Sequence, residues 1–256
     1  MEDTKSEIDN VLKSLYADFS LIKIKYSEPK KLPRFEYIWL VFSCNIYFQS
    51  KDLLLITRDH EGKTERIKTS IYTIFRSILE DYFYLKLLTS RREKIDIHLK
   101  AFIASSQINN KKNLQSLLDL EVVGKFIPEI DPQHVLSLVG LKTKIAEYKH
   151  YIKLFENFSG ETKRLINIYL KVDQVCKEYD KIKGITKIAE GKEHESLEWL
   201  YNFIYRHTSG ATHQVLESKE PILDLLWYDK TYTSENKEVL GLLLVILNDI
   251  KSLYTS

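Results

Sequence analysis

The chain has 256 residues, which is enough for one large domain or two small ones with a sizeable core. Its formal net charge of +2 is too small for a protein that binds nucleic acid nonspecifically over its whole surface, so any contact with RNA must be local. Only 8 Gly and 5 Pro are present, and the turn pairs that mark hairpins are absent, which argues against a β-rich fold.

Cysteines, termini and apolar runs indicate a protein of the reducing cytoplasm. Cys44 and Cys176 are far apart and lack metal-ligand spacing, so we expect neither a disulfide framework nor a zinc site. The first ten residues are acidic and polar, unlike a signal peptide. The longest apolar runs, at 37–48 and 241–247, are shorter than the about 18–20 residues of a membrane-spanning helix, so we expect buried helices and no membrane partner.

Apolar residues recur at helical spacing along most of the chain and predict an all-α fold. We expect a compact bundle of roughly eight helices in one domain over 1–256, with the breaks after 33 and 120 as the only candidate boundaries. The first helix, 3–25, makes an N-terminal arm over 1–30 that ends at the proline-containing elbow 27–33. Helices are predicted in order at 35–57, 65–89, 91–120 (one or two), 133–157, 160–183, 194–218, 222–234 (short) and from 234 or 236 to 254, with a turn at 58–65 and breaks at 122–132, 157–161 and 183–195.

The helix expected at 65–89 is apolar on almost every side, which is typical of a buried helix. Arg76 and Glu80 lie four residues apart on the side opposite its main apolar stripe. Two interpretations stay open. The pair is either an ordinary i, i+4 surface pair or a polar pair at the lip of a cavity that orients a functional site.

The helix expected at 194–218 gathers the most reactive side chains of the chain, Arg206, His207, Ser209 and His213. Arg206 and His213 are seven residues apart and therefore share a helix face within about 20°, with about 10 Å of rise between them. Ser209 lies between them. A cation, a hydroxyl and an imidazole in this order suit an RNA phosphate and its neighbouring 2′-hydroxyl.

The same segment also allows a purely structural interpretation. Ser209, Gly210 and Ala211 are small and would let another backbone approach closely. A glycine in the middle of a helix costs about 1 kcal/mol relative to alanine, so close approach, a kink or a catalytic distortion would each give it a purpose. The residues alone do not decide between the structural and the functional interpretation.

The pattern in YRHTSGATH, an arginine followed by six residues and a histidine, resembles the Arg-x6-His motif of the HEPN superfamily of all-α proteins. The segment FRSILEDYFYLKLL resembles the R-x-x-x-E helix of a family of uncharacterised bacterial proteins with an HEPN-like core. That family also has a Y-x-x-x-S-x-x-x-H helix. Here the corresponding residues are Tyr205, Ser209 and His213, preceded by Glu198 and Tyr201. The resemblance covers these two helices.

The resemblance implies an HEPN-like core, with the motif helix and the C-terminal helix in 194–254. Many HEPN proteins are metal-independent endoribonucleases of antiviral defence and toxin–antitoxin systems, and they typically act as homodimers. By this resemblance Arg206 holds the scissile phosphate, His213 is the general acid or base, and the RNA 2′-hydroxyl attacks to give a cyclic phosphate. The expected partners are an RNA substrate, a second copy and an antitoxin or regulatory protein, and no cofactor or metal is expected.

Five further residues are expected to support that site. His207 stands where the superfamily often has Asn and is a second proton carrier, Ser209 bonds the phosphate, and Tyr205 belongs to the motif helix. Arg76 and Glu80 are expected to line the same cleft. Since several HEPN proteins are noncatalytic, the alternative is a helical partner-binding or nucleotide-sensing protein without enzymatic activity.

Overall fold

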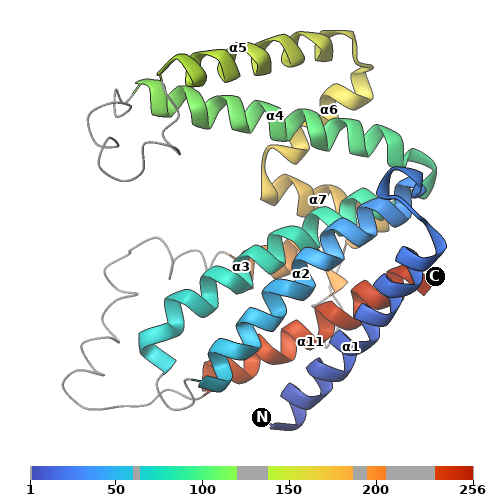
Figure 1. Ribbon diagram of the computed structural model, residues 1–256, viewed down its shortest axis with the longest axis vertical. Helices are drawn as coiled ribbons and strands as arrows, with labels where there is room; N and C mark the ends of the chain where they lie inside the picture. The colour runs from blue at the N-terminus through green and yellow to red at the C-terminus, as the bar shows by residue number, and fades with distance from the viewer. Residues whose placement is uncertain (1, 60–63, 120–137, 187–194, 206–233, 256) are drawn as a thin grey trace. The chain divides into compact units, whose positions relative to one another are not determined.

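The computed structural model describes residues 2–59, 64–119, 138–186, 195–205 and 234–255, and within these ranges the chain is helical and contains no strand (Figure 1). The predicted all-α fold is confirmed. The α-helices are α1 (Glu2–Lys25), α2 (Arg34–Asp59), α3 (Thr64–Thr89), α4 (Ile95–Asp119), α5 (Leu138–Leu154), α6 (Gly160–Tyr169), α7 (Val172–Lys183), α8 (Leu197–Leu200) and α11 (Ser234–Thr255). Short 3₁₀ turns are η1 (Pro29–Lys31), η2 (Arg92–Lys94) and η3 (Phe155–Asn157), and η5 (Tyr201–Tyr205) is a π-helical turn. None of the described helices combines the length and the apolarity that crossing a membrane requires.

The chain divides into two compact units, one comprising residues 1–92 and 175–256 and the other residues 93–174. The divisions therefore fall near 92 and 174 rather than after 33 or 120, where the sequence shows its strongest breaks. The expectation of a single domain over 1–256 stays a prediction. Each unit has its own buried side chains and is described by itself.

In the first unit, α1, α2, α3 and α11 lie side by side (Figure 1). Apolar spacing on α1 predicts one buried face, and all but one of its six members are buried: Ile8, Leu12, Leu15, Phe19 and Ile22, with Val11 half-buried. Six residues of α11 are predicted for its core face, of which Val239, Leu243, Ile246 and Ile250 are buried and Leu242 and Leu253 are half-buried; Leu240 and Leu247 are buried as well. The buried face of α11 is thus wider than the single stripe that was expected, as befits a helix packed against three others.

In the second unit, α4 packs against α5 and α6. The Nδ1 atom of His98 on α4 lies 2.7 Å from the hydroxyl oxygen of Tyr169 on α6, and both side chains are buried. The rings of Phe102 and Tyr169 meet edge to face with centroids 5.6 Å apart. This pairing gives the buried histidine the polar partner that burial requires.

Among the described residues, several helix boundaries differ from the sequence prediction: α4 begins at Ile95 rather than 91 and α5 ends at Leu154 rather than 157, each next to a 3₁₀ turn. One helix was expected over 160–183, but the chain forms α6 and α7, and the N–H groups of Leu170 and Lys171 bond the carbonyls of Ile166 and Ile168 at 3.1 Å. The second of these is an i→i−3 bond, so the last turn tightens and the helix ends. The expected turn at 58–65 was too long, because Asp59 and Thr64 are helical and only 60–63 lies outside the described residues.

The break predicted after 183 is confirmed at its start. Gly184 has a φ of 68°, a left-handed conformation that glycine adopts without strain. The N–H of the next residue, Ile185, bonds the carbonyl of Asp180 at 2.9 Å, which closes the end of α7. The helix expected from 160 begins there as α6, and Ser159 caps it, since the Ser159 hydroxyl accepts a hydrogen bond from the N–H of Thr162 at 3.2 Å.

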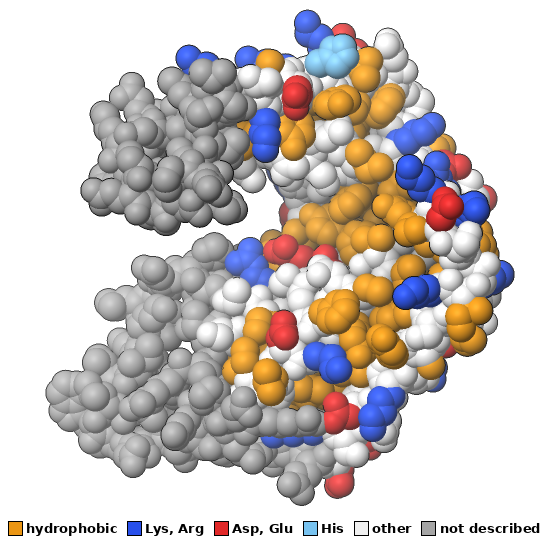
Figure 2. Space-filling view, in the orientation of Figure 1, with side chains coloured by type: hydrophobic (Ala, Val, Ile, Leu, Met, Phe, Trp, Pro, Cys, Tyr) orange, Lys and Arg blue, Asp and Glu red, His pale blue; other side chains and the backbone are white. Residues whose placement is uncertain are grey.

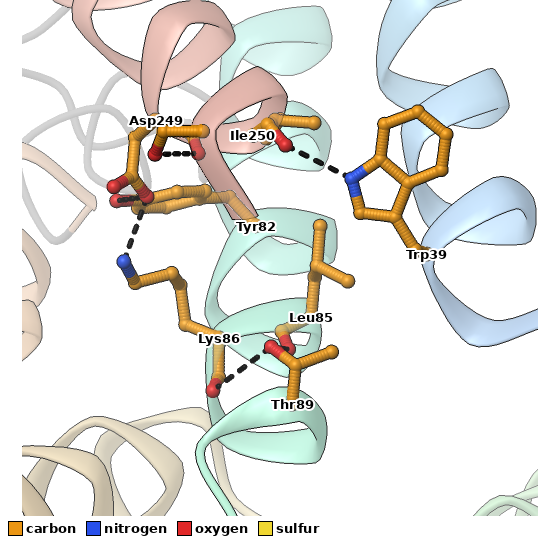
Figure 3. A network of polar contacts seen from close by, with 8 residues as sticks. Trp39, Tyr82, Leu85, Lys86, Thr89, Asp249 and Ile250 are labelled. Carbon is orange, nitrogen blue, oxygen red and sulfur yellow. Dashed lines mark hydrogen bonds and ion pairs between the residues drawn. The ribbon is translucent and has the colours of Figure 1, made fainter. Parts of the chain in front are cut away.

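A buried polar network joins α3 to α11 (Figure 3). One carboxylate oxygen of Asp249 accepts hydrogen bonds from the Tyr82 hydroxyl at 2.9 Å and from the Lys86 ammonium at 2.7 Å. The side chains of Lys86 and Asp249 are 11% and 31% exposed. Burial lowers the pKa of Lys86, but the charge of Asp249 and the neighbouring Tyr179 outweigh it and leave that pKa raised, so the ammonium stays charged.

A second link in the same view joins α2 to α11. The Trp39 indole donates a hydrogen bond to the carbonyl of Ile250 at 2.9 Å, and its ring stacks on Tyr254 with centroids 4.5 Å apart. Because these bonds are directional, they fix the position of α11 along its axis more closely than apolar contacts alone would.

We expect Asp249→Ala to lower the free energy of unfolding by about 3 kcal/mol, because it leaves a buried ammonium and a buried phenol without their acceptor. Asp249→Asn is the matched variant: it keeps an oxygen for Tyr82, loses the charge that pairs with Lys86, and should have an intermediate effect. Urea denaturation at neutral pH measures both. Equal stability of Asp249→Ala and the wild type would show that the network contributes nothing.

Candidate functional site

The structure brings three of the predicted site residues into direct contact. Arg76 and Glu80 on α3 form an ion pair with Arg76 Nε and Glu80 Oε1 3.4 Å apart. The hydroxyl of Tyr205, 129 residues after Arg76, accepts a hydrogen bond from Arg76 Nη2 at 3.0 Å and donates one to Glu80 Oε1. Cation, phenol and carboxylate therefore form a closed triangle.

The surroundings of α3 explain why this pair needs a third member. Of the four apolar or aromatic residues expected on the pair's own side of α3, Tyr72, Phe83 and Leu87 are buried and Tyr84 is half-buried. The side chains of Arg76 and Glu80 are 26% and 36% exposed, so they sit partly desolvated among apolar neighbours. Partly desolvated charges are stabilised by additional hydrogen bonds, and the Tyr205 hydroxyl supplies one to each of them.

Tyr205 is held by rings as well as by hydrogen bonds. It stacks on Tyr201 with centroids 5.2 Å apart, packs against Phe83 at 6.1 Å, and lies 4.9 Å beneath the guanidinium carbon of Arg76. Burial, followed by the hydrogen bond and charge of Glu80, raises the pKa of Tyr205, while Arg76 opposes the shift. The phenol is therefore neutral at physiological pH and acts as the donor to Glu80.

A buried aspartate anchors the segment that carries Tyr205. Asp180 on α7 accepts hydrogen bonds from the Ser196 hydroxyl at 2.6 Å and from the N–H groups of Leu197 and Glu198 at 2.9 and 3.1 Å. Ser196 in turn caps α8 by accepting from the N–H of Trp199 at 3.1 Å. A carboxylate at a helix N-terminus accepts hydrogen bonds from N–H groups that have no partner within the helix. Its negative charge is also stabilised by the positive end of the helix dipole.

The segment after α8 departs from the prediction. A regular helix was expected through 194–218, but Tyr201–Tyr205 form a π-helical turn. The wider i→i+5 turn is rare and costs local stability, so tertiary contacts must favour it here. Those contacts are the ones that Tyr205 makes with Arg76 and Glu80, and π-helical turns of this kind are frequently found at functional sites.

The remaining predicted site residues, Arg206, His207, Ser209 and His213, lie outside the described residues, and their roles stay predictions. Arg206 follows Tyr205 directly in the chain. In the part of the chain that the structure describes, no group of three or more His, Cys, Asp or Glu side chains is arranged to hold a metal ion.

Sequence reasoning missed a second polar cluster, next to the first on α3. One oxygen of Asp81 accepts hydrogen bonds from the amides of Asn45 at 2.6 Å and Gln49 at 3.1 Å, both on α2. Burial raises the pKa of Asp81 to about 6, the two amides oppose this shift, and the charge of Glu80 adds to it. The only signal in the sequence was the i, i+4 spacing of Asn45 and Gln49 on an otherwise apolar helix.

Comparison with protein families identifies one match. Residues 47–225 match a family described as a family of unknown function (DUF5677). The chain belongs to this family. The matched region includes Arg76, Glu80 and Tyr205, so the contact between α3 and η5 lies within the part of the chain that defines the family. No curated protein and no solved structure matched the chain.

We expect Tyr205→Phe to lower the free energy of unfolding by about 1–2 kcal/mol, because it removes two hydrogen bonds from partly buried charges and keeps the stacked ring. Tyr201→Phe is the matched control on the same turn. Thermal or urea denaturation measures the stability of both variants relative to the wild type. An equal loss in the two variants would mean that the Tyr205 hydroxyl has no special role in holding the segment on α3.

The pKa of Asp81 predicts a pH dependence of stability. Its folded-state value of about 6 lies above its ordinary value of 3.8, so the folded protein binds the proton more tightly than the unfolded chain. Stability should therefore rise as the pH falls from about 6 toward 4. Asp81→Asn keeps the shape and removes the ionisation, so the stability of the wild type relative to this variant should increase between pH 7 and pH 5 in parallel denaturation experiments. A difference that stays constant or shrinks would contradict the assignment.

Proposed function

We propose that this protein is a metal-independent endoribonuclease of the HEPN type, which cuts RNA through its 2′-hydroxyl and serves in bacterial defence or a toxin–antitoxin system. One observation supports the proposal. The two segments that carry the resemblance are far apart in the sequence, yet Arg76 and Glu80 of the R-x-x-x-E helix contact Tyr205, the second tyrosine of the motif helix. Two segments that form one site would be expected to meet in this way.

The reaction needs no group beyond the chain and the RNA. His213 takes the proton of a ribose 2′-hydroxyl, and the oxygen attacks the adjacent phosphorus. The bond from phosphorus to the 5′-oxygen breaks, the 5′-oxygen takes up a proton from His207, and a 2′,3′-cyclic phosphate remains. Arg206 holds the phosphate oxygens and stabilises the negative charge that develops on them. In this scheme, His207 is a second proton carrier and Ser209 a further hydrogen-bond donor to the phosphate.

Arg76, Glu80 and Tyr205 act in this scheme as positioning residues. Tyr205 is held by its ring and by both of its hydrogen bonds, and Arg206 is the next residue in the chain. Because Tyr205 is held in place, the position of the peptide bond that leads into Arg206 is restricted. Positioning of this kind matters because an error of about 1 Å in a reactive group can cost about a hundredfold in rate.

The test is cleavage of end-labelled single-stranded RNA and tRNA in the presence of EDTA. We expect the wild type to produce cyclic-phosphate ends and Arg206→Ala and His213→Ala each to lose at least about a hundredfold in rate. A substrate with a 2′-deoxy sugar at the cleavage position should resist the wild type, because the attacking group is missing. Glu80→Gln should lower the turnover number when it is assayed well below its melting temperature, so that the loss does not reflect unfolding.

The outcome that rejects the proposal is equally concrete. If the folded wild type cuts none of these RNAs, and Arg206→Ala and His213→Ala lower the melting temperature instead, those two residues hold the structure together. The alternative of a noncatalytic partner-binding or nucleotide-sensing protein would then be the better description.

A further inference from the structure

The outer face of α2 carries a stripe of exposed apolar side chains. Val41, Phe48 and Leu55 follow one another at intervals of seven residues and are 49%, 61% and 58% exposed. Residues seven apart lie within about 20° of each other around a helix, so these three form one line along the surface. In the view of Figure 2, hydrophobic side chains are visible at the surface over α2 and its neighbours, with charged ones between them. An apolar stripe with polar neighbours is typical of a site of protein interaction.

A groove of about 380 Å³ lies beside this stripe, between α2 and α3. It is open to solvent, so it suits an extended occupant rather than an enclosed small molecule. Its lining is mainly apolar and consists of Val41, Phe42, Cys44, Asn45, Phe48 and Asp81. The groove and the stripe share Val41 and Phe48 and therefore make one continuous surface.

The edge of this surface on the α3 side is acidic. Asp81 is bonded to the amides of Asn45 and Gln49, and among the described residues no lysine or arginine pairs with it. Asp52 is exposed and follows Asn45 by seven residues, so it lies on the same side of α2. Lys51 lies on the other edge of the stripe, since it follows Phe48 by three residues whereas Asp52 follows Phe48 by four, and its ammonium lies 5.4 Å over the ring of Tyr47.

These charges argue against an antiparallel pairing of this surface with a second copy of the chain. In an isologous pair the same surface meets itself. Two antiparallel α2 helices related by a twofold axis would place the edge with Asp52 and Asp81 against the same edge of the other copy. Carboxylates brought together in this way repel each other, and a cationic partner would be attracted instead.

We propose that this groove binds an amphipathic helix of a partner protein, whose apolar side chains cover Val41, Phe48 and Leu55 while a lysine or arginine pairs with Asp81. Such a helix follows the usual helix-in-groove mode, with anchors at i, i+3 or i+4, and i+7. Its cation gives the half-buried Asp81 the opposite charge that the rest of the described chain does not supply. The proposal does not depend on the ribonuclease activity.

Cys44 provides a reporter inside the groove. It is half-buried, whereas Cys176 is buried, so a thiol reagent applied to the folded protein should modify Cys44 first. Burial raises the pKa of the Cys44 thiol, and labelling at mildly alkaline pH compensates for this shift. We expect the free protein to be labelled once and Cys44→Ser to resist labelling.

The experiment uses the full chain and a synthetic peptide of about 18 residues, long enough to form a helix on binding. The peptide has leucines at i, i+3, i+4 and i+7 and lysines beside them, and a matched peptide carries glutamates in place of the lysines. We expect the basic peptide to slow the labelling of Cys44 and to bind in fluorescence anisotropy. Phe48→Ser and Asp81→Asn should each weaken this binding about tenfold.

Two control variants on α1 test whether the effect is local. Leu21→Ser removes an exposed apolar side chain and Glu7→Gln an exposed acid, both away from the groove, and both should bind the basic peptide like the wild type. Circular dichroism melting checks that every variant is folded.

Four results would overturn the proposal. The first is an acidic peptide that binds as tightly as the basic one, and the second is a loss of binding in Leu21→Ser and Glu7→Gln as large as in the groove variants. Cys44 that cannot be labelled in the folded free protein would show that the groove is already covered. Self-association in analytical ultracentrifugation that Phe48→Ser abolishes would assign the surface to a second copy.

Discussion

The constraint on which most of this structure depends is the burial of α3 on nearly every side. The charged side chains of a helix in that position are partly withdrawn from water, so they need partners within the fold. Arg76 and Glu80 find Tyr205, Asp81 finds two amides on α2, and Lys86 finds Asp249 on α11. Three different segments of the chain are thus tied to α3 by directional bonds.

These bonds decide the arrangement of the first unit more than its apolar contacts do. Leucine and isoleucine tolerate small shifts along a helix axis, whereas an oxygen that accepts two hydrogen bonds does not. The carboxylate of Asp249 accepts from two residues of α3, and the carboxylate of Asp180 accepts from three groups around the start of α8. The first fixes α11 on α3, and the second fixes the direction in which the chain leaves toward Tyr205.

Periodicity was sufficient to predict the helical class, most helix boundaries and the buried faces of α1 and α3, because these depend on neighbours three or four residues away. The division between α6 and α7 was not predictable in this way, since both helices continue one amphipathic pattern and only the tightened turn at Lys171 separates them. The π-helical turn could not be predicted from periodicity either, because no glycine or proline in Tyr201–Tyr205 marks a change of helix type.

The candidate site shows the limit most clearly. Arg76, Glu80 and Tyr205 were each identifiable from spacing and from the resemblance, and Arg76 and Glu80 were expected to line the motif cleft. Their closed triangle spans 129 residues of sequence and could not be derived from local pattern. Asp180 and Asp81 gave almost no signal, because a single aspartate on an amphipathic helix is usually a solvent-exposed side chain.

The triangle also constrains the chemistry proposed for the motif helix. Arg76 is paired with Glu80 and bonded to Tyr205, so α3 brings a neutral pair to this place rather than a net positive charge. A phosphate bound nearby would therefore need its countercharge from elsewhere, and in the proposed mechanism Arg206 supplies it. Neutralising Glu80 would release the positive charge of Arg76 into the same space. In that proposed mechanism, the neutral pair lets α3 hold Tyr205 in position without competing with Arg206 for the phosphate.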